Sequence, residues 1–140
     1  MTPIRTTADD SAEGAEGTTY YLLGGEHVGA EMAAGLGEGG HTVRVVGESF
    51  DPAGDVESNE SPTNVRALAE AGLGAASAVV VATGSDARNL LVAQLVRSHF
   101  EVPRIVVLVN DPRRFEVLED AGHEPVCATA ALSAALLERL

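Results

Sequence analysis

The chain contains no lysine and no tryptophan, and all nine of its basic residues are arginine. The chain has 21 acidic residues, so its 140 residues carry a net charge of −12. Proteins that bind nucleic acid neutralise phosphates with clustered basic side chains, so this balance argues against a nucleic-acid partner. An acidic, lysine-free surface suits a cytosol of very high salt, where the Debye length falls to about 3 Å at 1 M. We therefore predict a salt-adapted, halophilic host.

Cysteine and long apolar runs are also scarce. The one cysteine, Cys127, excludes a disulfide within the chain, and the first residues lack the apolar core of a signal peptide. No apolar run approaches the roughly 18 residues that are needed to span a bilayer. These absences predict a cytoplasmic protein without direct membrane insertion, which would reach a membrane only peripherally, through a partner.

The composition predicts one globular domain after an acidic tail. Residues 1–17 are rich in Thr, Ser, Ala, Gly and acidic side chains and carry no periodic apolar residues, so we expect them to be disordered. The chain has the size of one ordinary domain, and its 45% of apolar residues are enough to bury a core. We predict a single domain over residues 18–140.

Short β-rich runs alternate with helical segments in this domain, which is the pattern of βαβ units around a parallel sheet. Two of the runs are continuously apolar, over residues 78–82 and 105–109, as is typical of strands buried on both faces. The predicted strands cover residues 19–23, 42–46, 78–82, 104–109 and 125–127. The predicted fold class is α/β, a Rossmann-like, doubly wound and mostly parallel sheet.

The predicted helices begin at Ser, Thr or Asp residues, which are good N-caps. The predicted caps are Ser61, Ser85, Asp111 and Thr129. The helix after Thr129, over residues 130–140, carries an apolar stripe that is expected to dock on the sheet or on a second copy of the chain. The stripe consists of Leu132, Leu136, Leu137 and Leu140.

The segment over residues 47–60 is acidic and rich in turn-forming residues. A doubly wound fold normally holds a helix and a third strand at this place, and fourteen residues are too few for both. We expect a loop with at most a very short edge strand near Val56. The region between the second and fourth strands is therefore predicted to be shortened.

A glycine-rich turn follows the first predicted strand. In the fingerprint Gly-x-Gly-x-x-Gly, Gly24 and Gly29 fill the first and third positions, and Glu26 occupies the second, where backbone approaches a pyrophosphate. A carboxylate about 4 Å from a phosphate costs roughly 4 kcal/mol at an effective dielectric near 20, which weakens binding without excluding it. Backbone amides at the helix N-terminus remain available to an anion. The predicted phosphate loop consists of Gly24, Gly25, Glu26, His27, Val28 and Gly29.

Two further turns are candidate parts of the same site. Residues 83–86, which are Thr83, Gly84, Ser85 and Asp86, follow a predicted central strand at its carboxyl end, where open sheets bind ligands. The same turn is also explained as a simple strand-to-helix connection with Ser85 as its cap. After the second strand, Gly47 stands where an acidic residue normally grips ribose hydroxyls, and Glu48 follows one place later on the opposite face.

With these residues placed, the chain resembles the N-terminal nucleotide-binding domain of potassium-transport regulators, the TrkA-N or RCK family, in its halophilic archaeal type. The resemblance covers residues 19–140, and its most specific part is residues 82–86 together with Asn89. Other matching runs are Gly40-His41-Thr42-Val43, Ala71-Gly72-Leu73, Val102-Pro103-Arg104, Val109-Asn110-Asp111-Pro112 and Ala121-Gly122-His123. Departures from the family pattern are Glu26, Gly47, Glu60-Ser61 and Leu108.

The resemblance implies a sensor and not an enzyme. Members of this family bind NAD(H) or an adenine nucleotide such as ATP, ADP or AMP, form homodimers, and relay occupancy to the membrane subunit of a potassium transporter or channel. The second, smaller domain that often follows in this family is not in the sequence, so we expect a stand-alone nucleotide domain.

Two other functions remain open from the sequence. The first is a degenerate, ligand-free Rossmann scaffold that mediates dimerisation or assembly, in which the glycines serve only turns and packing. The second, a small NAD-dependent oxidoreductase, would need a substrate domain and a proton donor. The four histidines lack metal-ligand spacing, so no metal site is predicted.

Overall fold

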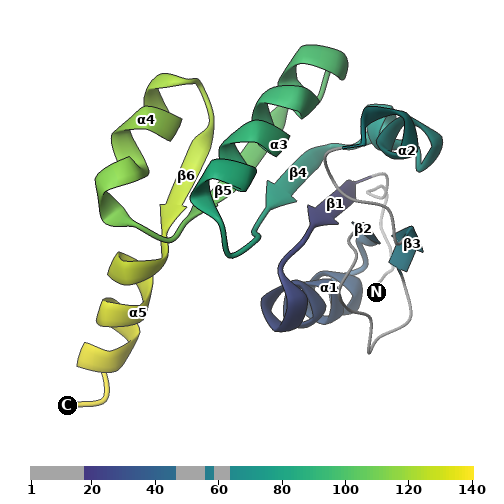
Figure 1. Ribbon diagram of the computed structural model, residues 1–140. Helices are drawn as coiled ribbons and strands as arrows, with labels where there is room; N and C mark the ends of the chain where they lie inside the picture. Colours follow the sequence, from purple (N-terminus) through teal and green to yellow (C-terminus); the bar gives the residue numbers. More distant parts are fainter. Residues whose placement is uncertain (1–17, 47–55, 59–63) are drawn as a thin grey trace.

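The computed structural model describes residues 18–46, 56–58 and 64–140, and the predicted tail over residues 1–17 lies outside them. Strands and helices alternate along the described chain (Figure 1), and η1 and η2 are short 3-10 helices. In chain order the elements are β1 (Thr19–Leu23), α1 (Glu26–Glu38), β2 (Thr42–Val46), β3 (Val56–Ser58), α2 (Val65–Glu70), η1 (Leu73–Ala75), β4 (Ala78–Val81), α3 (Asp86–His99), β5 (Arg104–Val109), η2 (Pro112–Arg114), α4 (Phe115–Asp120), β6 (Glu124–Cys127) and α5 (Ala128–Leu137).

The strands form one six-stranded sheet in the order β3-β2-β1-β4-β5-β6, and every pair of neighbours is parallel. This is the strand order of a doubly wound dinucleotide-binding fold, and it confirms the predicted fold class. The order reverses between β1 and β4, because the chain leaves β1 toward one edge of the sheet and later returns to build the other half. The strands β1 and β4 therefore end side by side at the centre of one edge, and the chain segments that follow them lead to opposite halves of the fold.

The predicted strand positions are confirmed with small shifts. The strand predicted over residues 78–82 ends at Val81, and the last strand begins one residue early, at Glu124. The expected short edge strand is β3, which has three residues and pairs with β2. The rest of the segment over residues 47–60 lies outside the described residues, apart from β3 itself.

The core lies between the central strands and α3. Both Val79 and Val81 of β4 are fully buried, as are Val92 and Val96 of α3. Along β5 the burial alternates, with Ile105, Val107 and Val109 buried and the two residues between them half-buried. The two faces of β5 are therefore covered unequally, although its apolar run predicted burial on both.

Two predicted helix caps are confirmed. The Ser85 hydroxyl accepts a hydrogen bond from the Arg88 N–H at 3.2 Å, and the Asp111 carboxylate accepts one from the Arg113 N–H at 3.0 Å. At α2 the N-cap is Asn64, whose Oδ1 accepts from the Ala67 N–H at 3.0 Å. The predicted cap Ser61 lies outside the described residues.

The predicted cap at Thr129 is wrong. The helix α5 begins at Ala128, and Cys127 holds the N-cap position without a side-chain hydrogen bond to the helix. The cause is that β6 runs into α5 without a connecting loop, since the backbone is extended at Cys127 and helical at the next residue. Thr129 therefore lies inside the first turn.

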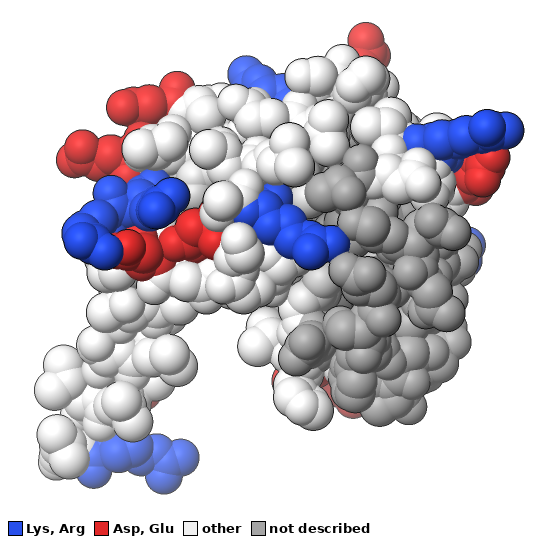
Figure 2. All heavy atoms as spheres, in the orientation of Figure 1, with Lys and Arg blue, Asp and Glu red and all other residues white. Residues whose placement is uncertain are grey.

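The α5 helix extends away from the sheet, contacting only β6 and η2 substantially among the described elements (Figure 1). Its leucines Leu132, Leu136 and Leu137 are 63%, 67% and 68% exposed, and Leu140 beyond it is 98% exposed. Figure 2 shows this projection as an almost wholly uncharged surface with charge near its end. Of the two predicted docking partners of this stripe, the sheet is therefore excluded, and docking on a second copy of the chain stays a prediction. None of the described helices combines the length and the apolar character needed to cross a membrane.

Candidate functional site

The candidate site lies at the carboxyl edge of the sheet, where the strand order reverses. Because parallel strands end at the same edge, the turns after β1, β4 and β5 come together there. We call this region the mouth and define it by residues 24–29, residues 83–86 and the pair Asn110 and Asp111. The first two sets are predicted site residues, whereas Asn110 had no predicted role and Asp111 was predicted only as a helix cap.

The glycine loop is held in shape by close packing. Gly24 and Gly25 have positive φ values of 80° and 98°, which side-chain-bearing residues rarely adopt. A Cβ on Gly24 would lie 2.6 Å from Thr83 Cγ2, and one on Gly29 would lie 2.8 Å from the Gly24 carbonyl oxygen. The loop thus contacts the Thr83 turn directly. Packing alone already requires these glycines, whether or not a ligand binds.

The α1 helix presents its N-terminus to the mouth. Gly25 is its N-cap in a left-handed conformation, and no described side chain caps the helix. The first N–H groups of a helix lack intrahelical partners and lie at the positive end of its dipole, so this terminus can receive an anion. His27 and Val28 are exposed in this first turn, although His27 was expected in a loop. The side chain of Glu26 lies outside what the structure describes.

The Thr83 turn is fixed by the buried amide of Asn89. Its Oδ1 accepts from the Thr83 N–H at 2.9 Å and from the Thr83 hydroxyl, and its Nδ2 donates to the Thr83 carbonyl at 3.0 Å. The second Nδ2 hydrogen bond goes to the Leu108 carbonyl on β5 at 2.9 Å. Asn89 is fully buried and makes all four of the hydrogen bonds an amide can form.

Asp86 joins the turn after β4 to the turn after β5. Its Oδ1 accepts from the Asn110 N–H at 2.7 Å and from Asn110 Nδ2 at 3.1 Å, and its Oδ2 accepts from the Asp111 N–H at 2.8 Å. Asn110 Nδ2 also donates to the Thr83 carbonyl at 3.2 Å. Both carboxylate oxygens of Asp86 are thus used within the protein, so the group positions the mouth.

An ion pair lies beside this turn. Arg113 donates to both carboxylate oxygens of Asp111, with Nη2 at 2.8 Å from Oδ2. These hydrogen bonds, together with one from the Arg113 N–H, hold the pKa of Asp111 at about 2. A hollow of about 400 Å³ is lined here by Asp111, Arg113, Arg114 and Val117. The Asp111 carboxylate is therefore ionised at neutral pH, and Arg113 occupies both of its oxygens.

The remaining predicted site residues are not placed. Gly47 and Glu48, the expected ribose-side residues, lie outside the described residues, as do Glu60 and Ser61. The structure thus brings the glycine loop and the residues 83–86 together, and it leaves the β2 side of the mouth undescribed. Sequence reasoning missed Asn110, whose only local signal is a polar residue directly after an apolar strand.

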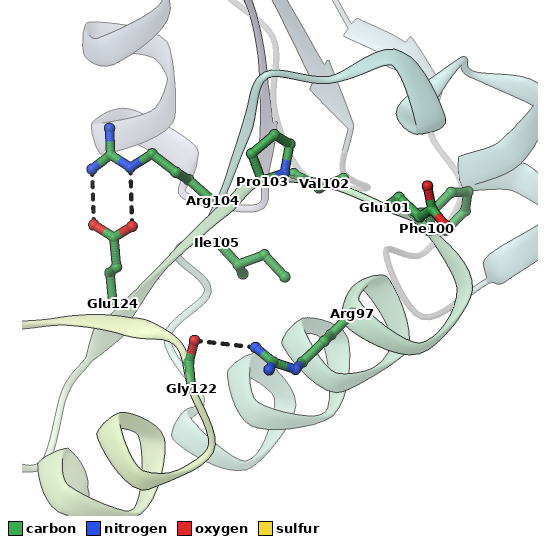
Figure 3. Close-up of a pocket in the computed structure, with 9 residues that line it drawn as sticks. All are labelled: Arg97, Phe100, Glu101, Val102, Pro103, Arg104, Ile105, Gly122 and Glu124. Carbon is green, nitrogen blue, oxygen red and sulfur yellow. Dashed lines mark hydrogen bonds and ion pairs between the residues drawn. The ribbon is translucent and has the colours of Figure 1, made fainter.

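A second cavity, of about 410 Å³, lies at the opposite edge of the sheet, at the amino ends of β5 and β6 (Figure 3). Arg104 forms two hydrogen bonds with the Glu124 carboxylate, at 2.9 and 2.8 Å, and Arg97 Nη1 donates to the Gly122 carbonyl at 3.1 Å. The cavity lies at the amino ends of the strands and the mouth at their carboxyl ends, so the length of the strands lies between them. It is therefore not part of the candidate site.

Comparison with known proteins decides the family. The family model of the TrkA-N domain matches residues 20–129, which include all of β1 but its first residue, the glycine loop and the turn after β4. The chain belongs to the TrkA-N domain family. The resemblance to this family that was inferred from the sequence is thereby confirmed, and the halophilic archaeal type stays a prediction.

Two curated relatives of this TrkA-N chain carry the name of the Trk potassium uptake system. The chain is 31% identical over 126 residues to the Trk system potassium uptake protein TrkA homolog of Methanothermobacter thermautotrophicus. It is 29% identical over 126 residues to the Trk system potassium uptake protein TrkA of Streptomyces coelicolor. Each alignment covers 85% of this chain and 58% or 56% of the relative, so the chain spans somewhat more than half the length of these proteins.

Solved structures share the fold. The GsuK RCK domain matches with a TM-score of 0.76 at 24% identity, covering 87% of this chain and 27% of that one. GsuK bound to ADP matches with a TM-score of 0.75, covering 89% of this chain and 34% of that one, and the GsuK channel bound to NAD with 0.73, covering 89% and 23%. Both of these are also 24% identical to this chain, so they establish its architecture alone.

Proposed function

We propose that this TrkA-N chain is a regulatory domain of a potassium-transport system that binds NAD(H) or an adenine nucleotide at the mouth. One observation carries the proposal: the glycine loop, the uncapped N-terminus of α1 and the Thr83 turn meet where the strand order reverses. Open sheets bind nucleotides at this point. The ligands named for the GsuK structures, ADP and NAD, and the names of the curated relatives support it.

The proposed roles follow from position. In this proposal, backbone groups of residues 24–29 bind the phosphates. The turn over Thr83, Gly84 and Ser85 lies beside them, because Thr83 contacts Gly24 of the loop. Asp86 holds that turn against β5, and Gly47 and Glu48 are the proposed ribose-side residues. All of these roles use binding groups and none requires a proton donor, so the proposed function is sensing without catalysis.

The proposed signal is a population shift between two arrangements of a homodimer. A nucleotide that bridges the glycine loop and the Thr83 turn favours the arrangement that binds it better. A second copy of the chain is the proposed partner of the exposed α5 leucines, and the membrane subunit of a potassium transporter or channel is the proposed receiver. Such a domain works in the cytoplasm and reaches the membrane peripherally, through that subunit.

A ligand-free scaffold is the second candidate function, and a specific observation favours it. The contacts at Gly24 and Gly29 require glycine for packing alone, so these residues would persist in a fold that had lost its nucleotide. The two candidates differ in one measurable property, which is saturable nucleotide binding at the mouth.

The test is an amide NMR titration of the protein with NADH and with ADP in molar potassium chloride. We expect saturable shifts in residues 24–29 and 83–86, and no shifts at Arg97 and Gly122 beside the opposite cavity. Shifts that are absent, or that spread over the surface without saturation, would leave the scaffold as the function.

A further inference from the structure

Asn110 lies at the carboxyl end of β5, and the oxygen of its side-chain amide has no hydrogen-bond donor within the described part of the chain. Its backbone N–H donates to Asp86, and its Nδ2 donates to the Thr83 carbonyl and to Asp86 Oδ1. Among the described residues nothing donates to its Oδ1, and the residue is exposed. Asn110 therefore offers the mouth the carbonyl oxygen of its side chain as an acceptor.

The orientation of this amide is determined by its neighbours. Both atoms beside Nδ2, the Thr83 carbonyl oxygen and the Asp86 carboxylate oxygen, can only accept hydrogen bonds. Turning the amide over would place its oxygen against two acceptors. The acceptor is thus held in one direction by two contacts with the turn over residues 83–86, which limits the conformational entropy that a ligand contact would cost.

Position decides which part of a ligand can meet this oxygen. From the glycine loop after β1, β5 is two strands away, which is about 10 Å at the usual strand spacing. In a doubly wound fold the pyrophosphate lies at the glycine loop, and the two nucleosides of a dinucleotide lie over the two halves of the sheet. The second nucleoside would therefore lie over the half of the sheet that contains β4 and β5, where Asn110 lies.

Because Asn110 Oδ1 is an acceptor, only a hydrogen-bond donor of the ligand can bind it. A phosphate oxygen is itself an acceptor and carries negative charge, so it gains nothing from Asn110 Oδ1 and is repelled by the adjacent Asp86 carboxylate. A ribose hydroxyl and a carboxamide N–H are donors, and both occur in the second nucleoside of NAD(H). A nucleoside triphosphate extended toward β5 would bring only acceptors.

We propose that Asn110 is a specificity-determining residue that accepts a hydrogen bond from a donor of the second nucleoside, so that the mouth prefers a nicotinamide dinucleotide to ADP or ATP. This inference rests on the proposed nucleotide-binding function. It adds a residue that the resemblance left without a role, and it selects one ligand class among those that the family implies.

The test compares three ligands on three proteins. NADH, ADP-ribose and ADP are titrated into the wild type, the Asn110→Ala variant and the matched control Gln94→Ala, which removes an exposed amide from α3. We expect Asn110→Ala to weaken NADH binding about 3- to 10-fold, as for the loss of one neutral hydrogen bond, and to change ADP affinity by less than about 2-fold. Gln94→Ala should bind all three ligands like the wild type.

The comparison of NADH, ADP-ribose and ADP distinguishes the possible outcomes. An equal loss of ADP-ribose affinity identifies a ribose hydroxyl as the donor, and a loss confined to NADH identifies the carboxamide. Equal losses for all three ligands would mean that Asn110 only supports the turn, and they would overturn the inference. So would a wild type that binds ADP as tightly as NADH. If the wild type binds none of the three, the proposed function fails, and this inference fails with it.

Discussion

Asn89 is the side chain on which the geometry of the mouth depends most. It is fully buried, and it joins the turn after β4 to β5 through hydrogen bonds to Thr83 and Leu108. A buried amide of this kind specifies one arrangement, because any other leaves polar groups unpaired. At the residue scale the mouth is therefore built on amides, with Asp86 and Asn110 completing the network.

The Asn89→Leu substitution tests this role. It keeps a similar volume but removes the Asn89 amide from the Thr83 N–H and the Leu108 carbonyl, and it leaves the Thr83 carbonyl with only its hydrogen bond from Asn110 Nδ2. We expect a loss of about 3 kcal/mol in the free energy of unfolding, measured in urea at neutral pH. The exposed control Gln94→Ala should change it by less than about 0.5 kcal/mol. Similar stabilities for the two variants would refute the role given to Asn89.

His123 is the second informative side chain, and it makes stability depend on pH. It is only 5% exposed, and neither ring nitrogen has a hydrogen-bond partner among the described residues. Burial, and then the nearby Arg97 charge, lower the pKa of His123 below its ordinary value. His123 therefore binds a proton more readily in the unfolded chain than in the folded one. The contribution of neutral His123 to the free energy of unfolding is fully present above about pH 7 and is lost as the pH falls.

The expected result is a fall in the unfolding free energy of the wild type between about pH 7 and pH 5 that is smaller in the His123→Leu variant. At neutral pH the leucine variant should be at least as stable, because a buried unpartnered polar group is costly. The exposed substitution Gln94→Ala supplies the control, because it changes no ionisable group and should keep the wild-type pH dependence. Parallel curves for wild type and His123→Leu would contradict the assignment.

The sequence predicted only part of this residue-scale arrangement. Residues 24–29 and 83–86 were found because each set is a local motif after a strand. The role of Asn110 was missed because it arises from contacts with Thr83 and Asp86, 27 and 24 positions away in the chain. Spacing along the chain does not reveal contacts that depend on the order of strands in the sheet.

At the scale of elements, α1 and α5 show how differently two helices are held. The α1 helix packs on β2 and is locked to the glycine loop by the close approach of Gly29 to the Gly24 carbonyl. The α5 helix is exposed over its leucines and begins one residue before its predicted cap. Capping signals predicted the start of α3 and η2 because those follow loops, and they failed at α5 because no loop precedes it.

Two glycines within α1 test whether the close approach of Gly29 to the Gly24 carbonyl holds the helix to the glycine loop. A Cβ at Gly29 would meet the Gly24 carbonyl oxygen at 2.8 Å, whereas one at Gly35 would meet nothing within 4 Å. We expect Gly29→Ala to lower the free energy of unfolding by about 1 to 3 kcal/mol, because the loop and helix must separate. Gly35→Ala should raise it by up to about 1 kcal/mol through helix propensity. Equal effects in thermal unfolding would show that the contact at Gly29 is unimportant.

The α5 helix supplies the prediction for assembly. If its leucines bind a second copy, the double variant Leu132→Glu with Leu136→Glu should sediment as a monomer under conditions where the wild type is a dimer. Charges buried in an apolar interface are strongly unfavourable. The control Ala131→Glu places the same charge on the other side of the helix and should leave the dimer intact. A wild type that remains monomeric would contradict the proposed dimer, and a double variant that remains dimeric would assign the dimer to another surface.

At the scale of the whole molecule, a six-stranded parallel sheet carries its candidate site at the reversal of strand order, on a chain of net charge −12. The alternation of strands and helices was enough to predict this architecture, because each strand is a distinct apolar run. Whether the mouth still holds a nucleotide was not decided by the same signals, since its glycines serve packing as well as binding. High salt should favour any nucleotide complex of so acidic a protein, because it screens repulsion between like charges.

The central claim is most directly tested by titration calorimetry of the purified chain against NADH, NAD, ATP, ADP and AMP in molar potassium chloride. We predict saturable micromolar binding, with NADH or NAD bound most tightly. An absence of binding up to millimolar concentrations of all five would contradict the sensor function and leave the chain as a Rossmann scaffold without a ligand.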